Sequence, residues 1–129
     1  MDKNIIDSCA HDSYAGTASF GEIVMRLAGA GVESYYADYR ARTTTYYGPE
    51  GDSYTIPLTR SAAAIPPDFD AAGVQDAIRG AQRGDVKYPA FVSLSVAAGC
   101  VGYMVWIAGR HVAYYGRAGE MHVEKFPPQ

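Results

Sequence analysis

The spacing of hydrophobic residues divides the first half of the chain into two predicted helices followed by three predicted strands. Small and apolar residues recur at intervals of three and four over 2–15 and again over 19–30, which is typical of amphipathic helices. The pattern then alternates and becomes rich in Tyr and β-branched residues, as in strands. The predicted strands are 32–39, 43–47 and 53–58.

The same pattern returns 68 positions later, so residues 1–58 align with residues 69–126 without a gap. The sequence Tyr-Tyr-Gly-x-x-Gly occurs at 46–51 and again at 114–119, at the same distance from a preceding Ala-Gly. Residues 59–68 contain a proline pair that disfavours a helix. We interpret the chain as an internal duplication joined by this linker. The strands of the second copy are predicted at 100–108, 111–115 and 121–126.

Signals for helix ends occur at the same places in both copies. Asp2 and Asp70 precede the first helix of each copy, where a carboxylate accepts hydrogen bonds from the free N–H groups of the first turn. Gly16 and Gly84 follow these helices, where a left-handed residue ends a helix. A Ser-x-x-Glu capping box begins at residue 19. We therefore predict the order ααβββ in each copy.

Neither copy can bury both faces of its own sheet, so the two copies are predicted to share one core. The expected fold is a single α+β domain over residues 1–129. We predict a two-layer sandwich of two ααβββ repeats, with an antiparallel sheet packed on helices. Hydrophobic residues make up 48% of the chain, and the net charge of −3 is small, so a folded domain is favoured over disorder. Without a basic excess to neutralise phosphates, no nucleic-acid partner is expected.

The N-terminal residues 1–14 lack the basic and apolar regions of a secretory signal, so a cytoplasmic location is predicted. Residues 88–109 carry no charge and reach the length of a membrane span. The aligned stretch of the first copy carries charged residues such as Glu22, so no membrane span is expected. Cys9 and Cys100 are interpreted as reduced core residues.

A set of motifs, mostly in the second copy, carries a family resemblance. They are Gly73-Val74…Ala77-Ile78…Gln82-x-Gly84 and Phe91…Ala98-Gly99-Cys100-x-Gly102-Tyr103…Tyr114-Tyr115-Gly116-x-x-Gly119-Glu120-x-His122-x-Glu124-x-Phe126-Pro127. Over nearly its whole length the chain resembles the YdfO-like family, small uncharacterised bacterial proteins of which some are labelled phage envelope proteins. The resemblance implies a compact, duplicated α+β fold and a prophage origin. It implies no established activity, cofactor or catalytic residue.

Adjacent tyrosines are the most unusual feature of a chain that contains eleven of them. Tyr46 and Tyr47, and again Tyr114 and Tyr115, stand side by side in predicted strands. Neighbours in a strand point to opposite faces, so one tyrosine of each pair is predicted to lie away from the helices. This aromatic surface favours a binding role. The alternative is cross-strand pairing that only stabilises the sheet.

A second candidate site lies in the last predicted strand. Glu120, His122 and Glu124 alternate and therefore share one face, where they could ligate a metal or supply an acid/base pair. In the predicted hairpin, His111 falls about opposite Glu124. No zinc-type spacing such as C-x-x-C accompanies them, and the alternative is a surface hydrogen-bond cluster.

These patterns favour a small binding or interaction module over an enzyme. We expect it to contact a protein partner, or a second copy of itself, through the Tyr-rich sheet surface or the groove between its halves, and we expect no cofactor. Arg42 and Arg110 occupy equivalent strand turns, as an anion clamp or as solvated surface residues. An enzyme or metal protein centred on the Glu-x-His-x-Glu strand is one alternative. A phage-related structural protein is the other.

Overall fold

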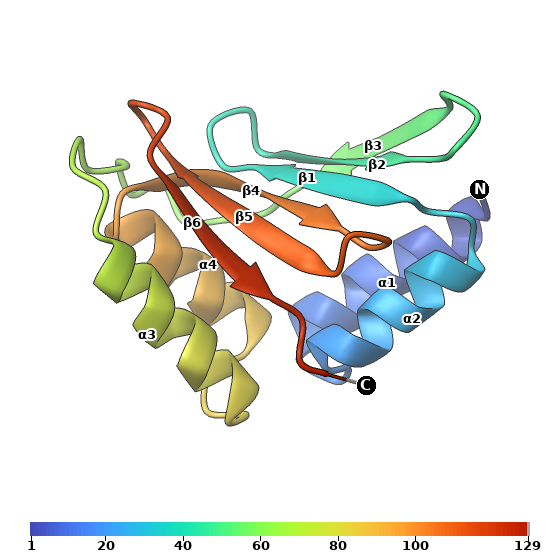
Figure 1. Ribbon diagram of the computed structural model, residues 1–129, viewed down its shortest axis with the longest axis horizontal. Helices are drawn as coiled ribbons and strands as arrows, with labels where there is room; N and C mark the ends of the chain where they lie inside the picture. The colour runs from blue at the N-terminus through green and yellow to red at the C-terminus, as the bar shows by residue number, and fades with distance from the viewer. Residues whose placement is uncertain (129) are drawn as a thin grey trace.

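The computed structural model describes residues 1–128 as four helices and one six-stranded antiparallel sheet. All four helices cover the same face of the sheet and leave the other face open (Figure 1). The α+β fold of antiparallel sheet on helices is therefore confirmed. The helices are α1 (Lys3–Ala15), α2 (Phe20–Gly29), α3 (Ala71–Gln82) and α4 (Tyr88–Ala97). The strands are β1 (Ser34–Asp38), β2 (Thr43–Tyr47), β3 (Ser53–Pro57), β4 (Cys100–Trp106), β5 (His111–Gly116) and β6 (Met121–Lys125).

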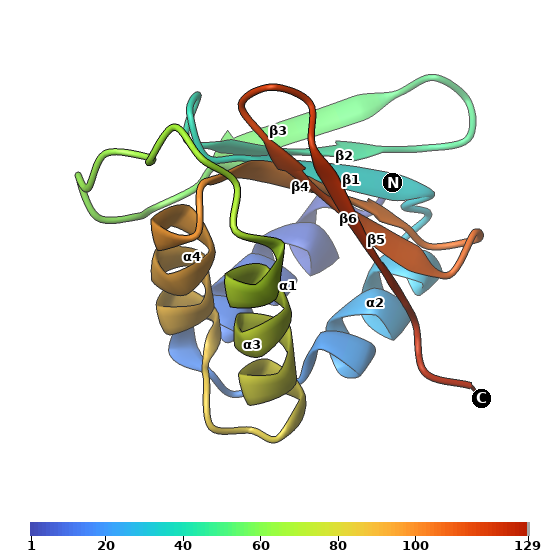
Figure 2. The same cartoon turned by 60° about the vertical axis from the view of Figure 1, so that its left-hand side comes forward.

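The strand order β3-β2-β1-β4-β5-β6 places three consecutive strands of each half on either side of the centre. We call residues 1–58 half one and residues 69–126 half two. β1 and β4 pair antiparallel, and Tyr36 lies opposite Met104. These two residues occupy equivalent positions in the two halves, so a pseudo-two-fold axis passes between them. The two helical hairpins lie side by side beneath the sheet (Figure 2).

The backbone repeats in detail as well as in element order. Arg42 and Arg110, which are equivalent, have left-handed φ angles of 58° and 56°. Three pairs of glycines with positive φ are also equivalent: Gly16 and Gly84, Gly31 and Gly99, and Gly51 and Gly119. This agreement supports the interpretation that the chain is an internal duplication, which stays a prediction.

The helices begin where the sequence predicts. The Asp2 carboxylate accepts hydrogen bonds from the N–H groups of Asn4 and Ile5, and the Asp70 carboxylate accepts one from Gly73. The predicted capping box at the start of α2 is present. Four of the six strands end one or two residues earlier than predicted.

The core lies between the sheet and the helices, and both halves contribute to it. Alternation along β1 turns Tyr35 and Ala37 toward the helices, and alternation along β4 does the same with Tyr103 and Val105. Within the described residues, no helix is both long enough and apolar enough to cross a membrane.

The segment between the halves is fixed to one end of the sheet. Arg60 donates from Nε to the carbonyl oxygen of Tyr39 at 2.8 Å, and Arg117 donates to that of Ile65 at 2.8 Å. The Ile65 side chain is buried in the core. The predicted linker is therefore an ordered part of the domain.

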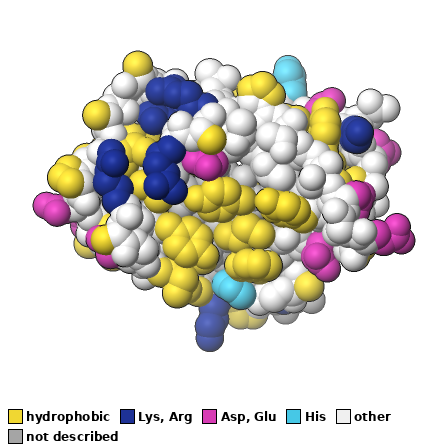
Figure 3. All heavy atoms as spheres, turned by 90° about the horizontal axis from the view of Figure 1, so that it is seen from above, with side chains coloured by type: hydrophobic (Ala, Val, Ile, Leu, Met, Phe, Trp, Pro, Cys, Tyr) yellow, Lys and Arg dark blue, Asp and Glu magenta, His cyan; other side chains and the backbone are white. Residues whose placement is uncertain are grey.

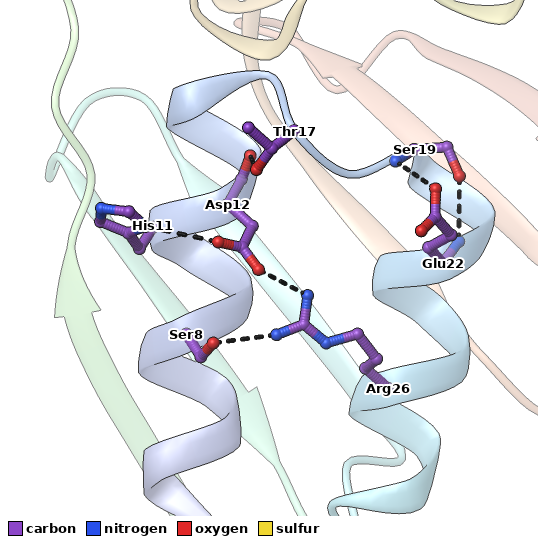
Figure 4. Close-up of polar contacts among 7 residues, drawn as sticks. All are labelled: Ser8, His11, Asp12, Thr17, Ser19, Glu22 and Arg26. Carbon is purple, nitrogen blue, oxygen red and sulfur yellow. Dashed lines mark hydrogen bonds and ion pairs between the residues drawn. The ribbon is translucent and has the colours of Figure 1, made fainter.

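Each half folds its two helices into a hairpin, but different contacts hold the two hairpins. In half one, Arg26 of α2 reaches Asp12 Oδ2 at 2.8 Å and Ser8 Oγ at 2.9 Å on α1 (Figure 4). The hydrogen bond from Arg26 lowers the pKa of Asp12, and His11 adds to the effect. In half two the residue equivalent to Asp12 is Gly80, which packs against Val86.

Candidate functional site

A groove of about 1130 Å³ lies between the two helical hairpins and the sheet. Residues of all four helices and of the helix-facing side of the sheet line it. Its size is close to that of known small-molecule sites, which are mostly apolar with a few polar groups.

Four tyrosines form the roof of this groove, two from each half. Tyr35 and Tyr46 pair across β1 and β2 with their ring centroids 5.2 Å apart. Tyr103 and Tyr114 pair across β4 and β5 with centroids 5.6 Å apart. The two pairs occupy equivalent positions, and each ring is more than nine-tenths buried. The groove therefore has a roof with approximate two-fold symmetry.

The hydroxyl groups of these tyrosines break the symmetry. The Tyr103 hydroxyl shares a hydrogen bond of 2.8 Å with that of Tyr88 on α4. The equivalent of Tyr88 is Phe20, which offers no hydroxyl to Tyr35. Tyr35, Tyr46 and Tyr114 have no side-chain hydrogen bond within residues 1–128. No fully enclosed polar side-chain atom of these residues lacks a partner, so the three hydroxyls open onto the groove.

The roof phenols are neutral at physiological pH. Burial raises the pKa of Tyr35, Tyr46, Tyr103 and Tyr114 above the ordinary value, because the phenolate would lose its hydration. Each therefore keeps its proton and can both donate and accept a hydrogen bond.

Aromatic contacts close the groove at two places. Tyr14 of α1 meets Tyr88 of α4 edge to face at 5.3 Å, which joins the two hairpins. Phe20 at the start of α2 meets Phe126 after β6 edge to face at 5.5 Å. The α1–α2 connection and the α3–α4 connection, with Lys87, both contribute to the lining, and we call this part of the groove its mouth.

A cluster of polar side chains lies on one side of the groove, where α3 covers β6. Glu124 accepts a hydrogen bond from Arg79 Nη1 at 2.7 Å. The Gln75 amide, with its oxygen toward Arg79, donates to His122 Nε2 at 2.7 Å. His122 and Glu124 are 3.9 Å apart and partly buried. The partners of Glu124 and His122 are thus a guanidinium and an amide, in place of metal-binding side chains.

The tyrosine pairs split between the two faces of the sheet as predicted. Tyr46 and Tyr114 face the helices and line the groove. Tyr47 lies on the open face with 40% of its surface exposed, and Tyr115 lies there partly buried.

The residues predicted to form the Glu-x-His-x-Glu site do not gather in one cluster, and only His122 and Glu124 lie close together. His111 lies opposite Lys125, one residue from the predicted register, and on the open face, so it does not approach Glu124. Glu120 accepts a hydrogen bond from the Ala118 N–H within the β5–β6 turn. Among residues 1–128 no three His, Cys, Asp or Glu side chains are grouped so that they could hold a metal ion.

Arg42 and Arg110 do not converge on a common site. Arg42 donates to the carbonyl oxygen of Arg60 at 3.0 Å, and Arg110 donates to that of Pro127 at 2.9 Å. Each arginine thus fixes the chain that follows the last strand of its own half. Arg110 also lines the groove.

Both cysteines are buried and free, in agreement with the prediction of core packing. Burial raises the pKa of the Cys100 thiol to about 11 and also raises that of Cys9. Neither forms a thiolate at neutral pH, although Cys9 lines the groove.

The comparisons with known proteins agree with the size of this domain. Residues 10–125 match the model of a family described as protein of unknown function (DUF1398). The chain belongs to this family. No curated protein matches the chain. The family model covers all four helices and all six strands, α1 from residue 10 onward, and therefore the whole roof of the groove.

Sequence reasoning did not identify the residues that enclose the groove together with the tyrosines. Ala37 follows Tyr35 at an interval of two, as Val105 follows Tyr103, and this interval is a signal that places the two tyrosines on the buried face with Tyr46 and Tyr114. The sequence contains no signal for the hydrogen bond between Tyr88 and Tyr103, because this bond depends on how α4 packs against the sheet.

Proposed function

We propose that the protein is a binding module that holds a small organic molecule in the groove between its two halves. The observation that carries this proposal is the set of three tyrosine hydroxyls in the roof that open onto the groove and have no hydrogen-bond partner among residues 1–128. A phenol hydroxyl that reaches the groove is free to donate a hydrogen bond to a bound molecule and to accept one from it. A ligand with hydrogen-bonding atoms would satisfy these hydroxyls while its apolar parts contact the rings.

The chemistry of the lining supports a planar, largely apolar ligand. The roof presents aromatic faces, and the walls add apolar side chains such as Ile23, Leu27 and Ile78. The phenols of the roof are neutral, so they orient a ligand without requiring a charge on its buried part. This arrangement favours binding over catalysis, because the groove roof offers no nucleophile beside a base.

The roof hydroxyls can be tested with a matched pair of variants and 2-naphthamide as the probe. Tyr46→Phe and Tyr114→Phe each remove one unpartnered hydroxyl, and we expect each to weaken probe binding about three- to tenfold in isothermal titration calorimetry. We expect neither to lower the thermal midpoint of the free protein, because no hydrogen bond is lost. Unchanged affinity in both variants would contradict the proposal.

Tyr39→Phe is the control for this experiment. The Tyr39 hydroxyl shares a hydrogen bond of 2.8 Å with Ser95, away from the groove lining. We expect this variant to lose about 1 kcal/mol of stability and to keep its affinity for 2-naphthamide.

A second variant tests the groove itself. Ala10 lines the groove on α1, and its equivalent in half two is the larger Ile78. Ala10→Phe would place a ring in the cavity, and we expect it to abolish detectable probe binding in a protein whose far-UV circular dichroism is unchanged. Full affinity in this variant would place the probe elsewhere. The expectations of a protein partner and of a phage-related role stay predictions.

A further inference from the structure

We propose that the ligand of this groove is an organic anion, with an aromatic body under the tyrosine roof and a carboxylate at the mouth. This inference rests on the proposed function. It depends on the charges around the mouth, which are separate from the hydroxyls that carry the binding proposal.

Cations outnumber acids along the groove lining, although the whole chain carries a net charge of −3. The lining includes four basic side chains from half two and two acidic ones. The basic residues are Arg83, Lys87, Arg110 and Lys125, and the acidic residues are Glu22 and Glu124. The local excess of positive charge therefore opposes the overall balance.

Both acids already have partners. Glu22 accepts a hydrogen bond from the Ser19 N–H at 3.1 Å in the capping box of α2. Glu124 accepts its hydrogen bond from Arg79, which lies outside the lining. Within residues 1–128, neither carboxylate forms an ion pair with a basic residue of the lining.

Three of the cations have no acidic partner. Arg83 pairs with Asp85 at 3.0 Å. Lys87, Arg110 and Lys125 have no carboxylate within 4.0 Å among residues 1–128. Lys87 lines the groove from the α3–α4 connection and Arg110 lines it from the β4–β5 turn, whereas the Lys125 side chain lies on the open-face side of β6, opposite His111.

The start of α4 adds to the positive potential beside Lys87. At the equivalent start of α2, Ser19 and Glu22 satisfy the free N–H groups of the first turn. At α4 the matching positions are Lys87 and Ala90, and no side chain caps the helix. The uncapped N-terminal end of a helix carries a partial positive charge, which favours an anion nearby.

Lys87 is held in place at the mouth. Its methylene groups pack against Gly16 at the end of α1, so that a Cβ on Gly16 would lie 3.3 Å from them. The apolar stem is therefore fixed between the two hairpins while the ammonium group reaches solvent. Lys87→Met keeps this packing and removes only the charge.

Three probes with the same ring system and different charge test the inference. 2-Naphthoate, 2-naphthamide and 2-naphthylmethylammonium are titrated into the full chain at low ionic strength. We expect naphthoate to bind about tenfold more tightly than the amide, because several exposed cations each contribute a small attraction, and the ammonium compound to bind most weakly. We expect added salt to narrow the difference between naphthoate and the amide.

Two variants assign this preference to residues. We expect Lys87→Met to weaken naphthoate binding about two- to fivefold and to leave the amide unaffected. We expect Arg110→Met to weaken naphthoate binding by more than it changes amide binding, because Arg110 also fixes the chain after β6. The control is Arg42→Met, because Arg42 is the equivalent of Arg110 but does not line the groove. It should change neither affinity.

The possible results separate the two proposals. Equal binding of the three probes, or tighter binding of the ammonium compound through the tyrosine faces, overturns the anion preference and leaves the groove as a binding site. A naphthoate preference that persists in both Lys87→Met and Arg110→Met also overturns it. If none of the probes binds, the groove does not accept aromatic molecules of this size, and both proposals are contradicted.

Discussion

The two halves of the molecule follow the same backbone path but hold it with different side chains. The α1–α2 hairpin is joined by a charged hydrogen bond between Arg26 and Asp12. The α3–α4 hairpin is joined by the close packing of Val86 on Gly80. The same helical hairpin can therefore be stabilised by polar contacts between its helices, as in half one, or by apolar contacts, as in half two.

The open face of the sheet shows the same difference. The strands of half one present mostly Ser and Thr there, whereas those of half two present Met104, Trp106, Met121 and Val123. Seen from above, hydrophobic side chains gather over one part of this face (Figure 3). Trp106 stands where half one has Asp38. The expectation of a protein partner on this face stays a prediction.

The helix-facing side of the sheet is where the halves agree. Tyr35 and Tyr103, and likewise Tyr46 and Tyr114, are identical pairs, and all four side chains are buried on this side. On this side both halves pack against a common core, so a change in one half disturbs the other. The open face has no such constraint, and there the two halves differ.

The largest expected effect concerns two glycines with the same φ. A Cβ on Gly31 would meet nothing closer than Met1 Cα at 3.6 Å, whereas a Cβ on Gly99 would overlap the Asp68 carbonyl oxygen. We expect Gly31→Ala to cost about 1–2 kcal/mol through its left-handed backbone alone. We expect Gly99→Ala to cost about 3 kcal/mol or more, because the linker must also move. Urea unfolding of the two variants measures the difference, and equal losses would contradict the asymmetry.

Alkaline pH tests a property that the halves share. Burial raises the pKa of Tyr46 and Tyr114 in the folded protein, so above about pH 10 the unfolded chain releases protons that the folded protein keeps. The free energy of unfolding should be unaffected below about pH 10 and should fall as pH rises, by up to ~1.4 kcal/mol per pH unit for each buried tyrosine.

Tyr46→Phe and Tyr114→Phe should each reduce this alkaline loss by a similar amount. Urea unfolding between pH 9 and 11 gives the slope, and absorbance at 295 nm follows the phenolates. A decrease of the slope in only one variant would show that the two positions are not equivalent.

The smallest expected effect compares the starts of α2 and α4. Ser19→Ala removes a hydrogen bond to the Glu22 N–H and should cost about 1 kcal/mol. Lys87→Ala removes no cap and should change stability by less than about 0.5 kcal/mol. Thermal unfolding followed by circular dichroism measures both, and a larger loss at Lys87 would reverse the comparison.

The sequence was sufficient for the elements and their order because those depend on local signals. Asp2, Asp70 and the Ser19 capping box mark helix starts, and alternation marks the strands. The same local reasoning misplaced His111 relative to Glu124 by one residue, because the register of a hairpin depends on how its turn closes. For the candidate site, sequence reasoning identified Tyr46 and Tyr114 but not the cavity beneath them.

By itself, the sequence determined the ααβββ order, the repeat at a spacing of 68 residues, and which tyrosines share a strand. These follow from periodicity and from the backbone preferences of single residues. Only the tertiary structure decided that Tyr35, Tyr46 and Tyr114 would keep free hydroxyls while Tyr103 is paired with Tyr88. It also brought Lys87 and Arg110 to one groove. The physical reason is that a hydrogen bond or a local charge excess depends on distances between elements far apart in the chain, which packing alone sets.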